Sequence, residues 1–163
     1  MAFDSKQQRE IMGRFATGVT VIGTPAPGEG DGTYGMTANA VTSLSLDPPL
    51  VLVCVQKGNQ MHGHLSGSRC FSMCILSEEQ QDVSDRFAFK GPKDFSGLET
   101  TTAETGAPIL PDVLGWVDCR LLDTLAGGDH DIFIGEIVAG ECRDGRPLLY
   151  AVGGYARLAD EDR

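Results

Sequence analysis

A track of small polar residues that runs directly into an apolar segment constrains this chain more than any other feature. The track starts at Gly35 and the apolar segment ends at Val55, with the sequence GMTANAVTSLSLDPPLVLVCV. The run from Leu50 to Val55 predicts a strand buried on both faces. Beside it, hydroxyl, amide and backbone groups can approach a flat ligand closely. The segment therefore predicts either a site for a planar polar ligand or a polar edge strand without one.

Length and charge exclude several classes of protein. The 163 residues predict one domain, residues 1–163, and the net charge of −10 argues against nucleic acid and anionic membranes as partners. No window reaches the ~20 apolar residues of a membrane span, and the N-terminus does not resemble a signal peptide. The five cysteines lack a CxxC motif and zinc-ligand spacing. We expect a cytoplasmic protein with reduced thiols and no metal.

The order of predicted elements favours a mainly β fold. A capping-box pattern at residues 5–8 predicts a first helix ending at Gly18. Strands are predicted over 19–24, 36–45, 50–55, 70–76, 116–125, 131–139, 148–151 and 154–158, with short helices over 59–66 and after a second capping box at 77–80. Residues 90–110 are predicted to be irregular. Sequential antiparallel strands with few helices favour a closed β-barrel with short helices, because closure removes exposed edges.

Two polar positions are further candidates for a site. His130 follows a Gly-Gly turn and lies between two acids, so either acid could orient its ring or raise its pKa; the alternative is a structural turn. Lys57 follows the apolar strand where a helix is predicted to start, which suits a phosphate, although a solvated lysine fits equally. Arg86, near the end of its short helix, has the same two interpretations.

Well-known catalytic motifs do not occur in the chain. There is no GxSxG, no HExxH and no P-loop. The segment GEGDGTYG fails the GxGxxG pattern at Thr33, and no helix is predicted to follow it. A Rossmann fold is therefore not predicted.

Six segments of the chain are informative as a set. They are Arg14-Phe15-Ala16-Thr17-Gly18-Val19-Thr20-Val21, Gly35-Met36-Thr37-Ala38-Asn39-Ala40, Ser43-Leu44-Ser45-Leu46-Asp47-Pro48-Pro49-Leu50, Cys70-Phe71-Ser72 with Leu76, Arg86-Phe87-Ala88, and Gly128-Asp129-His130. In order and approximate spacing, over almost the whole chain, this set resembles the flavin reductase-like family, the small NAD(P)H:flavin oxidoreductases that supply reduced flavin to two-component monooxygenases. The likeness is greatest to actinomycete reductases of natural-product (antibiotic) biosynthesis.

The resemblance implies an antiparallel, Greek-key split barrel of the FMN-binding type and a homodimer with flavin near the subunit interface. It implies that His130 is the catalytic contact to the nicotinamide of NADH, beside Asp129 and Phe15. It also implies a set of flavin contacts, with the last three on the phosphate side or beside it: Thr37, Ala38, Asn39, Ser43, Leu44, Ser45, Lys57, Asn59 and Arg86.

The expected activity is hydride transfer from NADH to FMN or FAD, followed by release of reduced flavin to a partner monooxygenase. NADPH is expected to be a poorer donor, since no Arg or Lys cluster lies near the Gly-Asp-His turn in sequence. Two alternatives share the fold: a non-catalytic flavin carrier, which would not need that turn, and a flavin-retaining oxidase resembling pyridoxamine phosphate oxidases, for which no extra basic cluster is present.

Overall fold

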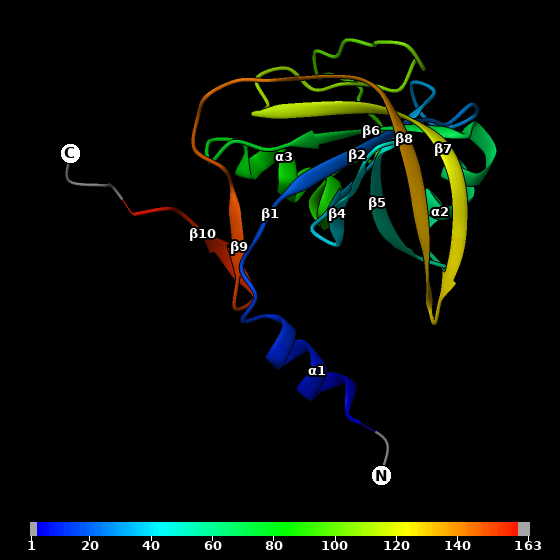
Figure 1. Cartoon of the computed structure of the whole chain (residues 1–163). Coiled ribbons are helices and arrows are strands. Elements are labelled where there is room, and N and C mark those ends of the chain that lie inside the picture. Colours follow the sequence, from blue (N-terminus) through cyan, green and yellow to red (C-terminus); the bar gives the residue numbers. More distant parts are fainter. Residues whose placement is uncertain (1–2, 160–163) are drawn as a thin grey trace.

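Two antiparallel sheets make up most of the structure. The computed structural model describes residues 3–159, apart from the side chains of residues 89 and 90. A seven-stranded sheet has the order β3-β2-β6-β7-β8-β5-β4, and a three-stranded sheet has the order β1-β9-β10 (Figure 1). The strands are β1 (Thr17–Gly18), β2 (Thr20–Pro25), β3 (Thr33–Ala38), β4 (Val41–Leu46), β5 (Pro49–Gln56), β6 (Cys70–Ile75), β7 (Gly115–Gly127), β8 (His130–Cys142), β9 (Leu149–Ala151) and β10 (Gly154–Ala156).

The prediction of a mainly β, antiparallel fold is confirmed, but the prediction of a closed barrel is wrong. Strands β3 and β4 form the two edges of the seven-stranded sheet and do not pair with each other. The chain passes from one edge to the other through the corner Asn39–Ala40, where the backbone N–H of Cys54 donates to the carbonyl of Ala40 at 2.9 Å. Since the edges meet only at this corner, the sheet stays open.

The same corner corrects two predicted strands. Residues 36–45 are not one strand but parts of β3 and β4, which lie at opposite edges. Strand β5 is not buried on both faces: Val51, Val53 and Val55 are buried, whereas the residues between them are partly exposed. An open sheet covers only one face of such a strand, and the side chains alternate accordingly.

Helices cover the sheet at a few places only. They are α1 (Ser5–Met12), α2 (Gln60–Ser68), α3 (Gln81–Asp85) and the π-helical turn η1 (Arg86–Lys90). Met61 and Leu65 of α2 are fully buried in a core cluster with Phe71 and Phe133. A second cluster packs Phe87 of η1 against β2, β6 and the 91–114 segment. As predicted, that segment is irregular, apart from an isolated bridge between residues 101 and 109.

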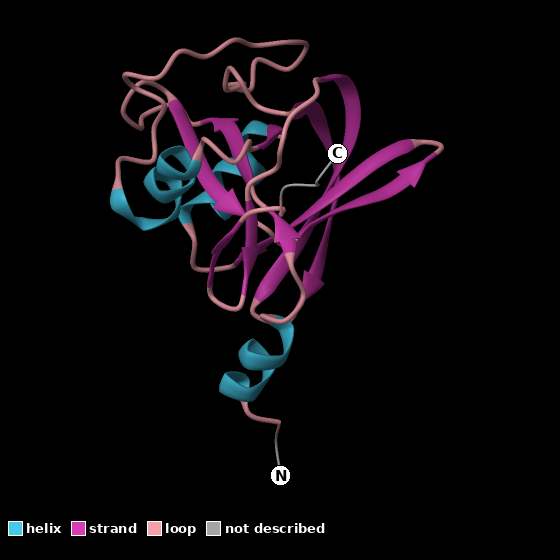
Figure 2. Cartoon of the chain, turned by 90° about the vertical axis from the view of Figure 1, so that its left-hand side faces the viewer, coloured by secondary structure: helices cyan, strands magenta, loops and turns pink. Residues whose placement is uncertain are grey.

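Helix α1 differs from its predicted form. Its N-cap is Asp4, whose carboxylate accepts from Lys6 N–H, and it ends at Met12 with Gly13 as C-cap, whereas Gly18 lies in β1. No residue of α1 is buried, and the helix projects below the sheets in both views (Figures 1 and 2). No helix within residues 3–159 is long and apolar enough to cross a membrane.

Candidate functional site

A cavity of about 230 Å³ joins the polar track to the C-terminal hairpin. Thr37, Ala38 and Asn39, three of the predicted flavin contacts, line it together. Its other walls come from segments distant in sequence. They are Val19 of the loop before β2, Ser84 of α3, Ala88 of η1, Tyr150 of β9 and Tyr155 of β10.

A hydrogen-bonded network fixes one wall of this cavity. The Thr37 hydroxyl donates to the Ser84 carbonyl at 2.6 Å. The phenol of Tyr155 donates to Asp85 Oδ1 at 2.9 Å and lies 2.8 Å from Ser84 Oγ. Burial raises the pKa of Tyr155, so the phenol stays protonated at neutral pH and remains a donor. Tyr150 packs edge-on against Tyr155, with ring centroids 5.6 Å apart.

The cavity residues Ser84, Tyr150 and Tyr155 were not predicted from the sequence. Ser84 lies two residues before the Arg86-Phe87-Ala88 motif, which was a weak signal for it. The tyrosines belong to a predicted terminal strand pair, but the sequence does not indicate which surface that pair covers. Only the three-stranded sheet, in which β9 pairs with β1, brings them to Thr37.

Gly35, the first residue of the track, has a packing role. A Cβ built at Gly35 would lie 2.5 Å from the ring of Phe87 and 2.9 Å from that of Phe95. Phe87 is 1% exposed. The missing side chain therefore lets η1 pack against β3, and η1 in turn supplies Ala88 to the cavity wall.

The second half of the track lies on edge strand β4. Ser43 pairs with Val51 and Ser45 with Leu50, so Leu44 forms a β-bulge without a partner in the strand ladder. Ser43 also lines a larger, mostly apolar cavity of about 660 Å³ that includes Val41, Met73 and Trp116. The track thus contributes to two cavities, one on each side of the Asn39–Ala40 corner.

His130 lies at the tip of the β7–β8 hairpin. The turn consists of Gly128 and Asp129, and Gly128 has φ of +76°, as a tight hairpin turn with glycine at its first position requires. His130 Nδ1 is 2.7 Å from Asp129 Oδ1, and this hydrogen bond lowers the pKa of Asp129. Of the two neighbouring acids, Asp129 is therefore the one that orients the ring, which is 43% exposed.

The remaining predicted site residues lie apart from the cavity. Lys57 Nζ donates to the Gly128 carbonyl at 2.7 Å, and Asn59 caps α2 by accepting from Met61 N–H at 2.9 Å. The Arg86 guanidinium donates to the carbonyls of residues 94 and 96. Phe15, which follows α1, is 71% exposed. The predicted site residues thus include a cavity group (Thr37, Ala38 and Asn39) and a hairpin group (Lys57, Asp129 and His130), and Arg86 and Phe15 belong to neither.

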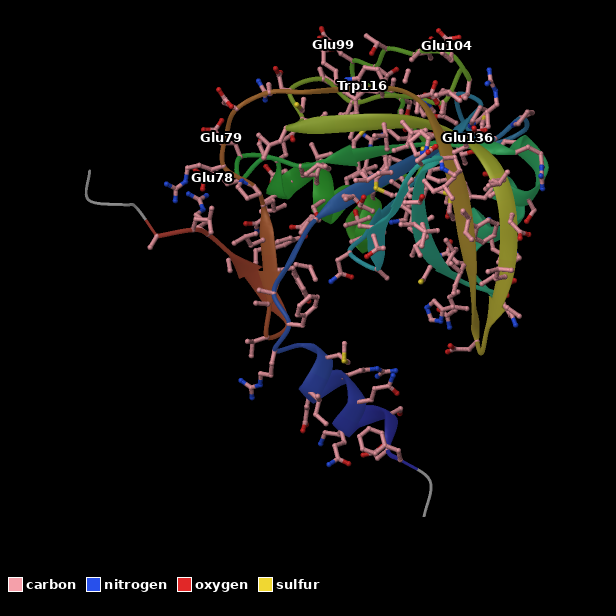
Figure 3. The ribbon with its side chains drawn as sticks, viewed as in Figure 1. Glu78, Glu79, Glu99, Glu104, Trp116 and Glu136 are labelled. Carbon is pink, nitrogen blue, oxygen red and sulfur yellow. The ribbon has the colours of Figure 1, made fainter. Side chains whose placement is uncertain are left out.

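Four acidic residues lie away from the hairpin tip. Glu78, Glu79, Glu99 and Glu104 lie along the upper edge and upper-left shoulder in Figure 3, whereas the hairpin tip lies at the lower right. Asp129 and Asp131 lie at the tip, and each has a hydrogen-bonded histidine. Within the described residues, no group of His, Cys, Asp and Glu could hold a metal ion.

The chain is similar to known proteins over most of its length. The model of the flavin reductase like domain matches residues 12–159. A probable flavin reductase of Rhizobium meliloti is 40% identical over 153 residues, which is 94% of this chain and 49% of that protein. The HsaB reductase subunit of a flavin-dependent monooxygenase from Rhodococcus jostii is 37% identical over 96% of this chain and 80% of its own length.

Solved structures agree with the sequence comparisons. The NADH:FAD oxidoreductase SgcE6 of Streptomyces globisporus, in complex with NAD and FAD fragments, superposes with a TM-score of 0.88 at 33% identity, covering 100% of this chain and 99% of that one. The chain spans about half the length of the Rhizobium relative and most of the other two.

Proposed function

The chain belongs to the flavin reductase-like family, and from this premise we propose that it transfers hydride from NADH to FMN or FAD and releases the reduced flavin to a partner flavin-dependent monooxygenase. The observation that carries the proposal is the family match over residues 12–159, which includes both the cavity group and the hairpin group. The Rhodococcus relative is named as the reductase subunit of a flavin-dependent monooxygenase, and the Streptomyces relative as an NADH:FAD oxidoreductase.

The residues present suit a flavin, which would accept a hydride that reduced nicotinamide supplies. The cavity is lined by tyrosine rings and small side chains, as a flat ring requires. The bulge at Leu44 leaves backbone groups of an edge strand outside the ladder, where they can bond the polar rim of a ring. We assign Thr37, Ala38, Asn39, Ser43, Leu44 and Ser45 to the ring. Asn59 and Arg86 are not assigned to the phosphate, because the Asn59 side chain caps α2 and the Arg86 guanidinium donates to the carbonyls of residues 94 and 96.

His130 is the proposed contact to nicotinamide. Asp129 orients its ring, and the tip of the hairpin is open to a ligand. The chain's part in hydride transfer is to hold two rings in contact at the distance that reaction needs, about 3–3.5 Å. This role requires positioning rather than an acid–base pair, in keeping with the hydroxyl, amide and aromatic groups of the cavity.

We further propose that the fold is a Greek-key split barrel and that the protein is a homodimer. Helix α1 exposes Ile11 and Met12, at 53% and 58%, and the 660 Å³ cavity beside Trp116 is mostly apolar. Both surfaces would be covered in a homodimer. Such a dimer would also bring Phe15 of one copy, which is 71% exposed in the single chain, to the nicotinamide site of the other.

NADH is the proposed donor in preference to NADPH. The charged groups at the hairpin tip are Asp129, Asp131 and Lys57, and the ammonium of Lys57 is already bonded to the turn. A 2′-phosphate would therefore meet two carboxylates without a dedicated cation. We expect kcat/KM with NADH to exceed that with NADPH, and an equal value for NADPH would contradict this assignment.

Steady-state oxidation of NADH tests the proposed function. Loss of nicotinamide absorbance should require added flavin and should be measured with FMN, FAD and riboflavin in parallel. A preparation that binds flavin yet oxidises no NADH would instead indicate the non-catalytic carrier.

A further inference from the structure

The end of the β7–β8 hairpin extends beyond the hydrophobic core. All of residues 122–129 are exposed, so core packing does not hold this end in place. On one side, β8 pairs with β5 up to the pair Gln56–His130. The position of the turn therefore depends on the residues that come directly after β5.

Lys57, the first residue after β5, bonds the turn at several points. Its backbone N–H donates to the carbonyl of Asp129 at 3.0 Å, and its Nζ donates to the carbonyl of Gly128 at 2.7 Å. The same Nζ lies 3.5 Å from Asp131 Oδ1. Lys57 thus contacts the backbone of Gly128 and Asp129 and the side chain of Asp131.

Asp131 joins this contact to helix α2. Its Oδ2 is 2.7 Å from His62 Nε2, and the hydrogen bond from His62, followed by the charge of Lys57, lowers the pKa of Asp131. The His62 ring is held edge-on against buried Phe133, with centroids 5.1 Å apart. Because successive side chains of a strand point to opposite faces, Asp131 faces away from the side on which His130 projects.

We propose that Lys57 and Asp131, supported by His62, are positioning residues that hold the Gly128–Asp129 turn and thereby set how His130 meets the nicotinamide. The inference rests on the proposed function. It gives Lys57 a different role from a flavin-phosphate contact, because the ammonium is directed to the turn. Lys57 acts through His130 and does not touch the reacting atoms.

Lys57→Met tests this role because it keeps an apolar stem and removes the ammonium. We expect KM for NADH to rise about threefold to tenfold, because the variant loses a charge-assisted hydrogen bond at a half-exposed site. The value of kcat should change less than about twofold. Lys57→Arg can bond the same carbonyl and carboxylate, so it should restore most of the NADH affinity. Arg120→Met is the matched control, since it removes one positive charge from an exposed position on the same hairpin.

Binding of FMN and riboflavin, monitored by fluorescence, separates the two roles of Lys57. If Lys57 positions the turn, Lys57→Met leaves both affinities within about twofold of the unchanged protein. Weaker binding of FMN but not of riboflavin would show a phosphate contact and overturn the inference, and so would an unchanged KM for NADH.

Asp131→Asn gives an independent arm of the test. It should also raise KM for NADH, and the double variant with Lys57→Met should be no worse than the stronger single variant, since both residues act on one turn. Additive effects would overturn the inference. Failure of the proposed function is distinguishable, because the unchanged protein would then show no flavin-dependent NADH oxidation at all.

Discussion

The phenol of Tyr155 donates a 2.9 Å hydrogen bond to Asp85, which ties the last strand of the chain to α3 beside the cavity. Asp85 is 8% exposed. A carboxylate in such surroundings depends on its donors, because water does not replace them easily. This bond therefore connects the stability of the C-terminal hairpin to the shape of the cavity that Thr37 lines.

Tyr155→Phe is expected to lower the free energy of unfolding by about 1–3 kcal/mol, the contribution of one hydrogen bond to a charged group. Flavin affinity should fall as well, because Ser84 loses the same neighbour. Tyr150→Phe is the matched control: it removes a phenol hydroxyl from the same cavity wall but leaves the bond to Asp85 intact. Urea unfolding of both variants checks the prediction, and equal losses would contradict it.

Gly35→Ala should destabilise the protein by about 1–3 kcal/mol through overpacking against Phe87. It should also weaken flavin binding, because η1 must move and Ala88 lines the cavity. Gly63→Ala in α2 meets no atom within 4 Å, so it should stabilise the helix by up to about 1 kcal/mol. If this account of Gly35 is correct, thermal unfolding will show a lower Tm for Gly35→Ala and a higher Tm for Gly63→Ala than for the unchanged protein.

His130→Ala is expected to lower kcat/KM for NADH roughly ten- to hundredfold, as for the loss of one hydrogen bond to a polar ligand group. Flavin affinity should change little, because the proposed ring contacts lie on β3 and β4. Parallel steady-state kinetics and flavin titration measure the two effects. Loss of flavin binding with an unchanged KM for NADH would place His130 in the flavin site instead, and no change in either would make the turn purely structural.

A homodimer is expected in solution, and α1 should contribute to it. Light scattering should give twice the chain mass for the unchanged protein. Ile11→Asp, which places a charge on the exposed apolar side of α1, should shift the equilibrium towards monomer and reduce activity in parallel. A fully active monomer would contradict both the dimer and the proposed role of Phe15.

The sequence predicted most strands because their apolar periodicity and turn residues are local signals. The two strands of the hairpin around Gly128 are an example. The lack of any such periodicity predicted that residues 90–110 would be irregular. It did not predict the break at Asn39–Ala40, because a single Asn without a neighbouring Gly or Pro is a weak turn signal and pairing with β5 decides where β4 begins. It placed the end of α1 at Gly18 rather than Gly13, because Gly13 and Gly18 are equally good C-cap signals in the sequence.

For the candidate site, the sequence indicated the polar track and the β7–β8 hairpin. It did not indicate which residues from distant segments lie beside them. Thr37, Ala38 and Asn39 line one cavity, and their contact with flavin stays a prediction. Tyr150 and Tyr155 were missed because only tertiary pairing brings β9 to β1. The bonds of Lys57 to Gly128 and Asp131 were missed for the same reason, since sequence spacing does not show that β5 ends beside the hairpin tip.

Anaerobic mixing of the flavin-loaded protein with NADH tests the central claim most directly. We predict that the flavin absorbance bleaches as NADH is consumed in equal amount, and that the reduced flavin is then found in the filtrate after ultrafiltration. Bound flavin that stays oxidised in the presence of excess NADH would contradict the account.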